Sequence, residues 1–205
     1  SNLMKVIEQL LANAGISPIA GVDEAGRGAC AGPLVIASVV LNDPFAAELA
    51  VVRDSKEIPE SKRDAVFDLI HQVAVSVSVV IVPASEVDSR GVHAANLDGM
   101  RRAVQGLTVE PAYVLTDGYA IEGLGVPNLA VWKGDQVVVS ISAASVIAKV
   151  TRDRIMREMD LEFPHYGFAG HKGYITAAHT KALNEHGPCA QHRQSFANVA
   201  ALIHK

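Results

Sequence analysis

Four carboxylates stand where apolar, strand-like segments end, and each has a glycine close by. Asp23 and Glu24 close the segment 19–24 just before Gly26, Asp117 precedes Gly118, and Asp135 follows Gly134. Loops at strand ends converge on ligands in α/β sheets, so we expect the four carboxylates to gather at one edge. Close carboxylates remain ionised together only when cations compensate their charge. Hard oxygen ligands of this kind favour Mg²⁺ or Mn²⁺ over zinc.

The pair Asp23 and Glu24 supports a metal site more strongly than the other two acids do. Asp117 and Asp135 each fit an ordinary turn, because Asp beside Gly is common there. Consecutive strand residues face opposite sides of a sheet, so either Asp23 or Glu24 points toward the core. An uncompensated charge is costly in a core. Two ions about 3.5–4 Å apart could hold the attacking water and the leaving oxygen of a phosphodiester.

A glycine-rich turn, 26–28, follows the same strand. The exposed N–H groups of such a turn can cradle a phosphate, with metal ions between the phosphate and the carboxylates. Gly26, Gly28 and Gly32 also approach a dinucleotide-binding fingerprint. We exclude that interpretation because Pro33 and the apolar segment after it predict a strand, whereas the fingerprint requires a helix.

Two further groups of residues have alternative interpretations. The spacing H-x-x-C-x-x-H at His186, Cys189 and His192 would suit zinc, but it lacks a clear fourth ligand. Asp153 lies four residues from Lys149 and from Arg157 on an expected helix, so an ion-pair ladder on the helix surface accounts for it.

Apolar spacing predicts the elements that position these residues. We expect helices over 3–14, 60–74, 93–107, 140–159 and 177–185, and strands over 19–24, 34–41, 75–82, 112–116 and 129–132. A tight glycine turn between the first two strands makes them antiparallel neighbours. The fold class is therefore α/β: a mixed sheet of about five strands, the first three antiparallel, flanked by helices. The helical C-terminal part completes this domain or lies against it.

Length and composition fit one soluble domain with an appendage. The chain has 205 residues, of which 49% are hydrophobic and 20% charged. Its apolar stretches are too short to span a bilayer, and we see no signal peptide. Cys30 and Cys189 suggest no disulfide framework, so we expect a cytoplasmic protein without membrane contact.

The charge is distributed unevenly along the chain. The net charge is −4, which argues weakly against nucleic-acid binding. Residues 1–148 hold 10 Lys and Arg against 17 Asp and Glu, whereas residues 149–205 hold 8 against 5 and six of the eight histidines. This is either chance variation or an acidic active site flanked by a mildly basic surface.

The motifs resemble those of the type 2 ribonucleases H, specifically bacterial ribonuclease HII. The matching segments are "GVDEAGRG" (21–28), "DSK" (54–56), "TDG" (116–118), "KGD" (133–135), "ISAASVIAKVTRD" (141–153), "YGFAGHKGY" (166–174) and "HRQSF" (192–196). They occur in the family's order and cover nearly the whole chain after residue 18. Any one of them is a weak signal, but together they are specific.

The resemblance implies a ribonuclease H-like fold, with a catalytic core over 1–160 and a helical C-terminal extension over 161–205. It implies a monomeric, Mg²⁺- or Mn²⁺-dependent endonuclease that cleaves RNA in RNA–DNA hybrids. It further implies incision on the 5′ side of single ribonucleotides embedded in duplex DNA, leaving 3′-OH and 5′-phosphate ends.

The resemblance also implies roles for individual residues. The family's catalytic, metal-binding carboxylates fall on Asp23, Glu24, Asp117 and Asp135, and not on Asp153. The turn Gly26, Arg27 and Gly28 would read the ribose 2′-OH. Tyr174 would pack at the RNA–DNA junction. Lys56 and Lys149 would contact phosphates.

The sequence departs from the family at three places and leaves two other functions open. "DSKEIPESK" is more acidic than the commoner form, Gly91 stands where many members carry Asn, and "GYIT" replaces "GYPT" or "GYAT". A resolvase or integrase type of nuclease shares the carboxylate chemistry but lacks the turn 26–28. A non-catalytic hybrid-binding protein would not need four acids that oppose nucleic acid.

Overall fold

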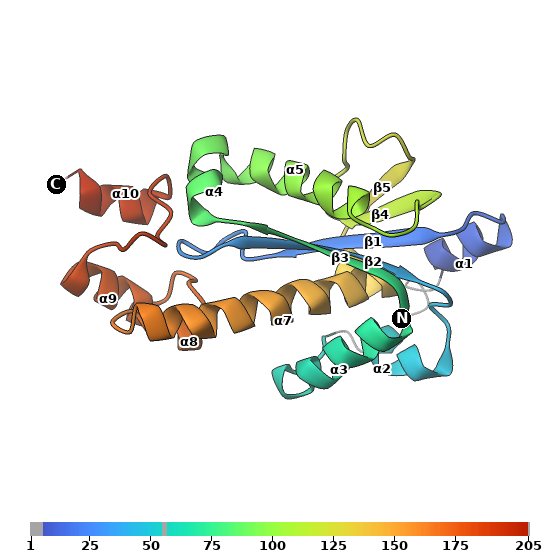
Figure 1. The fold of residues 1–205 in the computed structure, drawn as a ribbon, viewed down its shortest axis with the longest axis horizontal. Coiled ribbons are helices and arrows are strands. Elements are labelled where there is room, and N and C mark those ends of the chain that lie inside the picture. The colour runs from blue at the N-terminus through green and yellow to red at the C-terminus, as the bar shows by residue number, and fades with distance from the viewer. Residues whose placement is uncertain (1–5, 55–56, 205) are drawn as a thin grey trace.

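A computed structural model describes residues 6–54 and 57–204 of the chain. Its centre is a five-stranded sheet in the order β3-β2-β1-β4-β5 (Figure 1). The strands are β1 (Ile19–Ala25), β2 (Leu34–Leu41), β3 (Ala74–Val82), β4 (Tyr113–Asp117) and β5 (Asn128–Val131). The helices are α1 (Val6–Asn13), α2 (Ala50–Arg53), α3 (Glu60–Val73), α4 (Ala84–Arg90), α5 (Val92–Gln105), α6 (Gly134–Val137), α7 (Val139–Glu162), α8 (Phe168–His171), α9 (Ala177–His186) and α10 (Ala197–Ile203), with a 3₁₀ turn at Ala47–Leu49.

The pairing of the strands confirms the expected mixed sheet. β1 with β2 and β2 with β3 are antiparallel, whereas β1 with β4 and β4 with β5 are parallel. The prediction of a tight turn between β1 and β2 is wrong, because residues 26–33 form an eight-residue loop. Segments near the other end of the chain hold this loop: Cys30 N–H donates to Gly173 O at 3.0 Å, and Gly32 N–H donates to Gln191 O at 2.9 Å.

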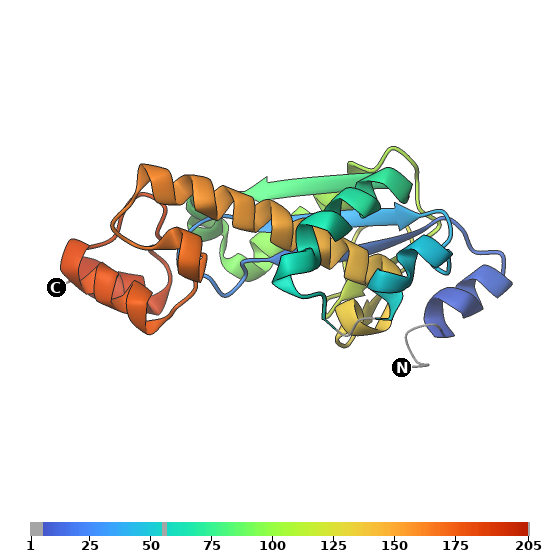
Figure 2. The same ribbon diagram turned by 90° about the horizontal axis from the view of Figure 1, so that it is seen from below.

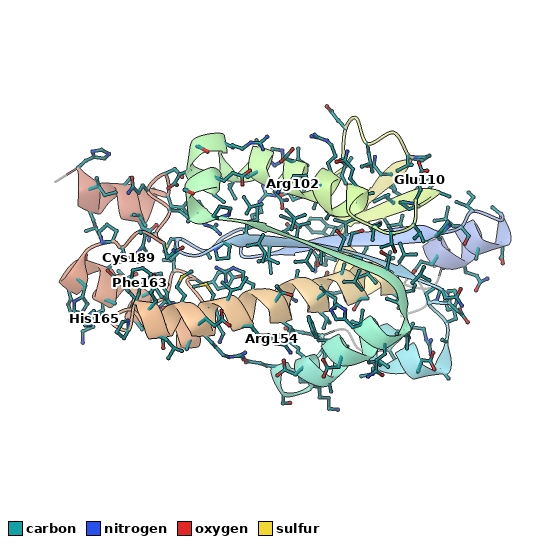
Figure 3. All side chains as sticks on the ribbon, in the orientation of Figure 1. Arg102, Glu110, Arg154, Phe163, His165 and Cys189 are labelled. Carbon is teal, nitrogen blue, oxygen red and sulfur yellow. The ribbon has the colours of Figure 1, made fainter. Side chains whose placement is uncertain are left out.

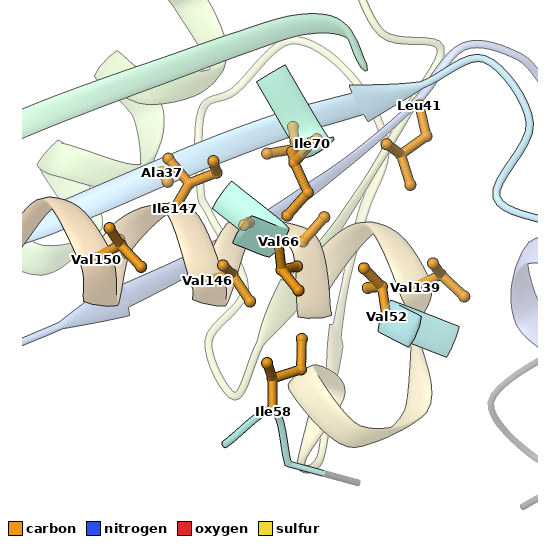
Figure 4. Close-up of a cluster of buried hydrophobic side chains, with 14 of the residues drawn as sticks. Ala37, Leu41, Val52, Ile58, Val66, Ile70, Val139, Val146, Ile147 and Val150 are labelled. Atoms are coloured by element: carbon orange, nitrogen blue, oxygen red, sulfur yellow. The ribbon is translucent and has the colours of Figure 1, made fainter. Parts of the chain in front are cut away.

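Helices cover both faces of the sheet. α7 and α3 lie against one face and α5 against the other (Figures 1 and 2). The alternation of β2 explains this arrangement, because Val35 and Ala37 pack in the cluster with α3 and α7, whereas Leu34 and Ile36 pack in the cluster with α5. Figure 4 shows the first cluster, in which Val66 of α3 and Ile147 of α7 come together.

The first turn of α7 is fixed from two sides. Gly21 of β1 lies so close that a Cβ atom there would come within 2.2 Å of the Ser140 carbonyl carbon. From α1, the buried Glu8 carboxylate accepts hydrogen bonds from Val139 N–H at 2.5 Å and from the Ser140 hydroxyl at 2.6 Å. The free N–H groups at a helix start need acceptors, so Glu8 acts as a distant cap for α7.

The C-terminal extension lies beyond the edge of the sheet and packs on the last turns of α7 (Figures 1 and 2). Phe163 and Cys189 lie near each other there (Figure 3), against a cluster that includes Met156 and Phe168. Cys30 and Cys189 are both free thiols. Across residues 6–54 and 57–204, no helix is both long and apolar enough to span a membrane.

Candidate active site

Three of the four predicted carboxylates meet at one edge of the sheet. β1 and β4 are parallel neighbours with Val22 opposite Thr116, so Asp23 and Asp117 follow at adjacent positions. α6 then adds Asp135. One ligand oxygen from each of these three aspartates lies within 4.8 Å of the others. This triad is the one group in the described part of the chain with metal-ligand spacing.

Short hydrogen bonds hold the aspartates in place. Gly134 N–H donates to Asp117 Oδ1 at 2.8 Å, which ties the start of α6 to the end of β4. Glu24 N–H donates to Asp23 Oδ1 at 2.8 Å. These bonds position Asp135 beside Asp117 and fix the orientation of the Asp23 carboxylate.

The positive charge near the acidic site does not balance its carboxylates. Burial, and then the neighbouring Glu24 and Asp117 carboxylates, raise the pKa of Asp23 well above its ordinary value. Burial raises the pKa of Asp117, which Lys149 partly opposes. Burial and the charge of Asp117 raise the pKa of Glu24 to about 7, although Arg27 opposes the shift. A bound cation would relieve this repulsion.

Glu24 lies beside the aspartate triad without joining it. Ala20 and Val22 pack on the α5 side of the sheet and Ala25 on the α7 side, so alternation turns Glu24 away from the face that carries Asp23. Its Oε2 atom is buried and has no hydrogen-bond partner. A buried oxygen without a partner is costly, and it is a ready ligand for a cation.

The predicted substrate-reading residues come together beside the acids. Gly26 N–H donates to the Tyr174 hydroxyl at 3.2 Å, and the Tyr174 side chain is 41% exposed. Gly28 is exposed. The Arg27 guanidinium lies 4.2 Å from the centre of the Tyr119 ring, and its Nη2 atom lies 3.3 Å from His93 Nδ1. Packing on this pair keeps Arg27 beside the acidic site.

Two adjoining pockets run from Asp135 to Tyr174. The first, of about 170 Å³, is lined by Asp135 and Lys149 among others. The second, of about 280 Å³, is lined by Tyr174 and Lys172, and both share Lys149 and Arg63. Arg63 and Lys172 are additional cations beside the site that were not among the predicted residues. Lys172 stands inside the segment 166–174, whereas nothing in the sequence marks Arg63. The predicted phosphate contact Lys56 lies outside the described residues.

The structure excludes the zinc interpretation and the ion-pair ladder. His192 Nδ1 accepts from Cys189 N–H at 3.0 Å and its Nε2 lies 2.9 Å from His179 Nε2, so both ring nitrogens are engaged. His186 stacks instead on His165, with ring centres 4.9 Å apart. In the part of the chain that the structure describes, Asp153 forms no ion pair; α7 pairs through Arg154 and Asp64 at 3.1 Å.

Comparisons with known proteins agree with these features. The family model for ribonuclease HII matches residues 20–199. The ribonuclease HII of Acidothermus cellulolyticus is 57% identical over 192 residues, which are 94% of this chain and 62% of that protein. The ribonuclease HII of Mycolicibacterium smegmatis is 54% identical over 199 residues, 97% of this chain and 73% of that protein. The chain thus spans less than two thirds of the length of the Acidothermus cellulolyticus protein.

A solved structure shares the fold. The crystal structure of ribonuclease H2 from Pyrococcus horikoshii OT3 superposes with a TM-score of 0.77 at 25% identity, covering 91% of this chain and 97% of that one. The ribonuclease H-like fold expected from the sequence is thereby confirmed.

Proposed function

The chain belongs to the ribonuclease HII family of phosphodiester-hydrolysing nucleases, and on that premise we propose that it cleaves RNA in RNA–DNA hybrids. We further propose incision on the 5′ side of single ribonucleotides in duplex DNA, leaving 3′-OH and 5′-phosphate ends. The observation that carries the proposal is the meeting of Asp23, Asp117 and Asp135 within 4.8 Å. The turn 26–28 and Tyr174 lie beside them. The enzyme acts as a monomer in the cytoplasm.

The residues present fit a divalent cation. Three carboxylate oxygens converge, and the buried Glu24 Oε2 atom lacks a partner. The donor set consists of oxygen atoms alone, which suits Mg²⁺ or Mn²⁺. Asp23, Glu24, Asp117 and Asp135 would hold two such ions. When bound, the ions supply charge stabilisation to the attacking water and to the 3′ oxygen as it leaves.

The remaining residues orient the substrate. The N–H groups of the turn 26–28 recognise the ribose, since the 2′-OH is what distinguishes RNA from DNA at one nucleotide. Tyr174 packs on the nucleotide at the junction. Lys149, which opposes the rise in the pKa of Asp117, contacts a phosphate close to the acids, and Lys56 contacts another.

Residues 1–160 form the catalytic core, and the C-terminal extension, residues 161–205, packs on it and adds Tyr174 to recognition. The extension supplies Tyr174, whose hydroxyl accepts from Gly26 N–H of the core. His179 supports this loop, since its Nδ1 lies 2.8 Å from Tyr174 O. The two parts therefore meet at the point where the ribonucleotide would lie.

The test is incision of a labelled DNA duplex that contains one ribonucleotide, with Mg²⁺, Mn²⁺ or EDTA. We expect a metal-dependent cut on the 5′ side of the ribonucleotide. Asp117→Asn and Asp135→Asn should each abolish cleavage while the circular dichroism spectrum stays unchanged, because each removes one charged oxygen ligand. An active Asp135→Asn protein would overturn the assignment of that residue. Binding without cleavage by the folded wild-type protein would favour a hybrid-binding protein instead.

A second experiment separates recognition from chemistry. Tyr174→Ala should weaken the preference for ribonucleotide junctions over long hybrids, whereas Tyr174→Phe keeps the ring and removes only the bond to Gly26 N–H. Unchanged junction preference in Tyr174→Ala would contradict the role of the aromatic ring.

A further inference from the structure

The loop 26–33, which carries the turn proposed to read the ribose, is held from inside the protein by two arginine side chains. Arg193 donates to Gly26 O at 2.8 Å, to Arg27 O at 3.2 Å and to Gly32 O at 3.1 Å. Arg152 donates to Ala31 O at 2.9 Å and to Pro33 O at 2.8 Å. Two guanidinium groups thus bind five of the eight carbonyl groups in this loop.

Both arginines are buried and lack a counterion. Arg152 is 1% exposed and Arg193 0%, and neither forms an ion pair with any residue that the structure describes. Their acceptors are neutral carbonyl groups. Burial, and then the charge of Arg152, lower the pKa of Arg193 to about 10, so it stays charged at neutral pH. A buried charge without a counterion is expensive to maintain, and here the return is a set of hydrogen bonds to loop carbonyl groups that an apolar side chain could not make.

The consequence of these bonds is the direction of the backbone. Because the carbonyl groups of Gly26 and Arg27 point inward to Arg193, the N–H groups of Arg27 and Gly28, which belong to the same two peptide units, point to the other side. Gly26 N–H donates to the Tyr174 hydroxyl at 3.2 Å. Over residues 6–54 and 57–204 the N–H groups of Arg27 and Gly28 have no acceptor, and Gly28 is exposed. These two N–H groups are therefore free to donate to a ligand.

Arg152 also connects the loop 26–33 to Tyr174. Arg152 donates to Lys172 O at 2.6 Å, and its guanidinium lies 5.2 Å from the centre of the Tyr174 ring. The fit is close: a Cβ atom on Gly26, which has φ +87°, would lie 2.0 Å from Arg152 Nε. The planar fork of arginine can bind several carbonyls in one fixed arrangement, which the single ammonium group of lysine cannot do.

We propose that Arg152 and Arg193 are positioning residues that set ribose recognition. Arg193 holds the turn 26–28 by the carbonyl groups of Gly26 and Arg27, and Arg152 holds the rest of the loop at Ala31 and Pro33. The free N–H groups of the turn and Tyr174 then form one fixed surface for the sugar and phosphate of the ribonucleotide. The inference rests on the proposed function. It assigns substrate discrimination to two residues that do not touch the substrate.

Arg152→Lys and Arg193→Lys test the proposal, because each keeps the charge and removes the fork. Arg154→Lys is the matched control, since Arg154 lies on α7 like Arg152 but has its side chain 47% exposed (Figure 3). Misplacement by about 1 Å can cost about 100-fold in rate. We expect kcat/KM on the single-ribonucleotide duplex to fall by about 30-fold or more in both variants and to stay within about two-fold of wild type in the control. The Mn²⁺ dissociation constant should stay within about two-fold of wild type in all three.

The outcomes separate the inference from the proposed function. If wild type cuts the duplex and the folded lysine variants cut it within about three-fold as well, the positioning role is refuted. A parallel loss of Mn²⁺ affinity would also refute it, since the arginines would then support the whole site. If wild type cuts neither a hybrid nor the ribonucleotide duplex, the proposed function fails and the inference falls with it.

A measurement on the wild-type protein covers the case in which the variants do not fold. In EDTA, the ¹⁵N–¹H signals of Arg27 and Gly28 should shift on addition of the single-ribonucleotide duplex and should shift less with the all-DNA duplex of the same sequence. Equal shifts with both duplexes, or no shift with either, would overturn the inference.

Discussion

Replacing Glu24 by Gln should stabilise the protein in the absence of metal while removing its activity. Glu24 is held among acids in a buried site that raises its pKa from 4.5 to about 7. Gln has the same shape and no charge. Each pKa unit corresponds to about 1.4 kcal/mol, so ionised Glu24 costs the metal-free protein about 3 kcal/mol at pH 8. For a chain of this length the gain in Tm should be about 6–12 °C.

The pH dependence of this effect has a definite sign. The folded-state pKa of Glu24 is raised, so its protonated form stabilises the protein below pH 4.5, and that stability is lost as the pH rises through about 7. The Glu24→Gln variant has no carboxyl group at this position, so it does not lose this stability as the pH rises. The difference in the free energy of unfolding should therefore be largest at pH 8 and fall below about 0.5 kcal/mol at pH 4.5.

Thermal unfolding followed by circular dichroism in EDTA at pH 4.5, 6 and 8 measures this difference. Glu110→Gln is the control, because Glu110 is exposed and precedes β4 at the end opposite Asp117. Saturating Mn²⁺ should reduce the advantage of Glu24→Gln, since at 100 times the dissociation constant it stabilises wild type by about 2.7 kcal/mol. Equal Tm values at pH 8 in EDTA, or a difference that persists at pH 4.5, would refute the reasoning.

Two further predictions concern the start of α7. Glu8→Ala leaves the Val139 and Ser140 N–H groups without their acceptor and should lower the free energy of unfolding in urea by about 1–3 kcal/mol. Glu8→Gln should lower it by less. Equal stability of wild type and both variants would contradict the capping role. Gly21→Ala forces a Cβ atom onto the Ser140 backbone and should cost about 3 kcal/mol or more, whereas Gly170→Ala, where the space is open, should melt like wild type.

The regular elements could be predicted because their apolar periodicity is strong. The strands 19–25 and 34–41 and the long helix α7 appear within a few residues of the expected bounds. The short helices α4 and α10 were not predicted, because seven residues give too little periodicity to recognise. The local residue types of the loop 26–33 favour a tight turn, whereas contacts with distant segments determine its path.

Part of the site could be predicted for a similar reason. Asp23, Asp117 and Asp135 follow strands, and parallel strands bring their ends together. Arg152 and Arg193 gave no such signal, because arginine is mostly exposed and only the packed structure shows that these two are buried. Glu8 likewise acquires its function from Val139, 131 positions away.

The hydrogen bonds of Arg193 have a consequence for the order of assembly during synthesis. Arg193 reaches Arg27 O across 166 positions, whereas the last carboxylate of the acidic site, Asp135, is made nearly 60 residues before Arg193. At about 5–20 residues per second, that gap lasts about 3–12 s on the ribosome. The growing chain therefore contains the four carboxylates of the acidic site before it contains Arg193, which holds the loop 26–33. The acids are present first, and the support of the proposed recognition loop is made last.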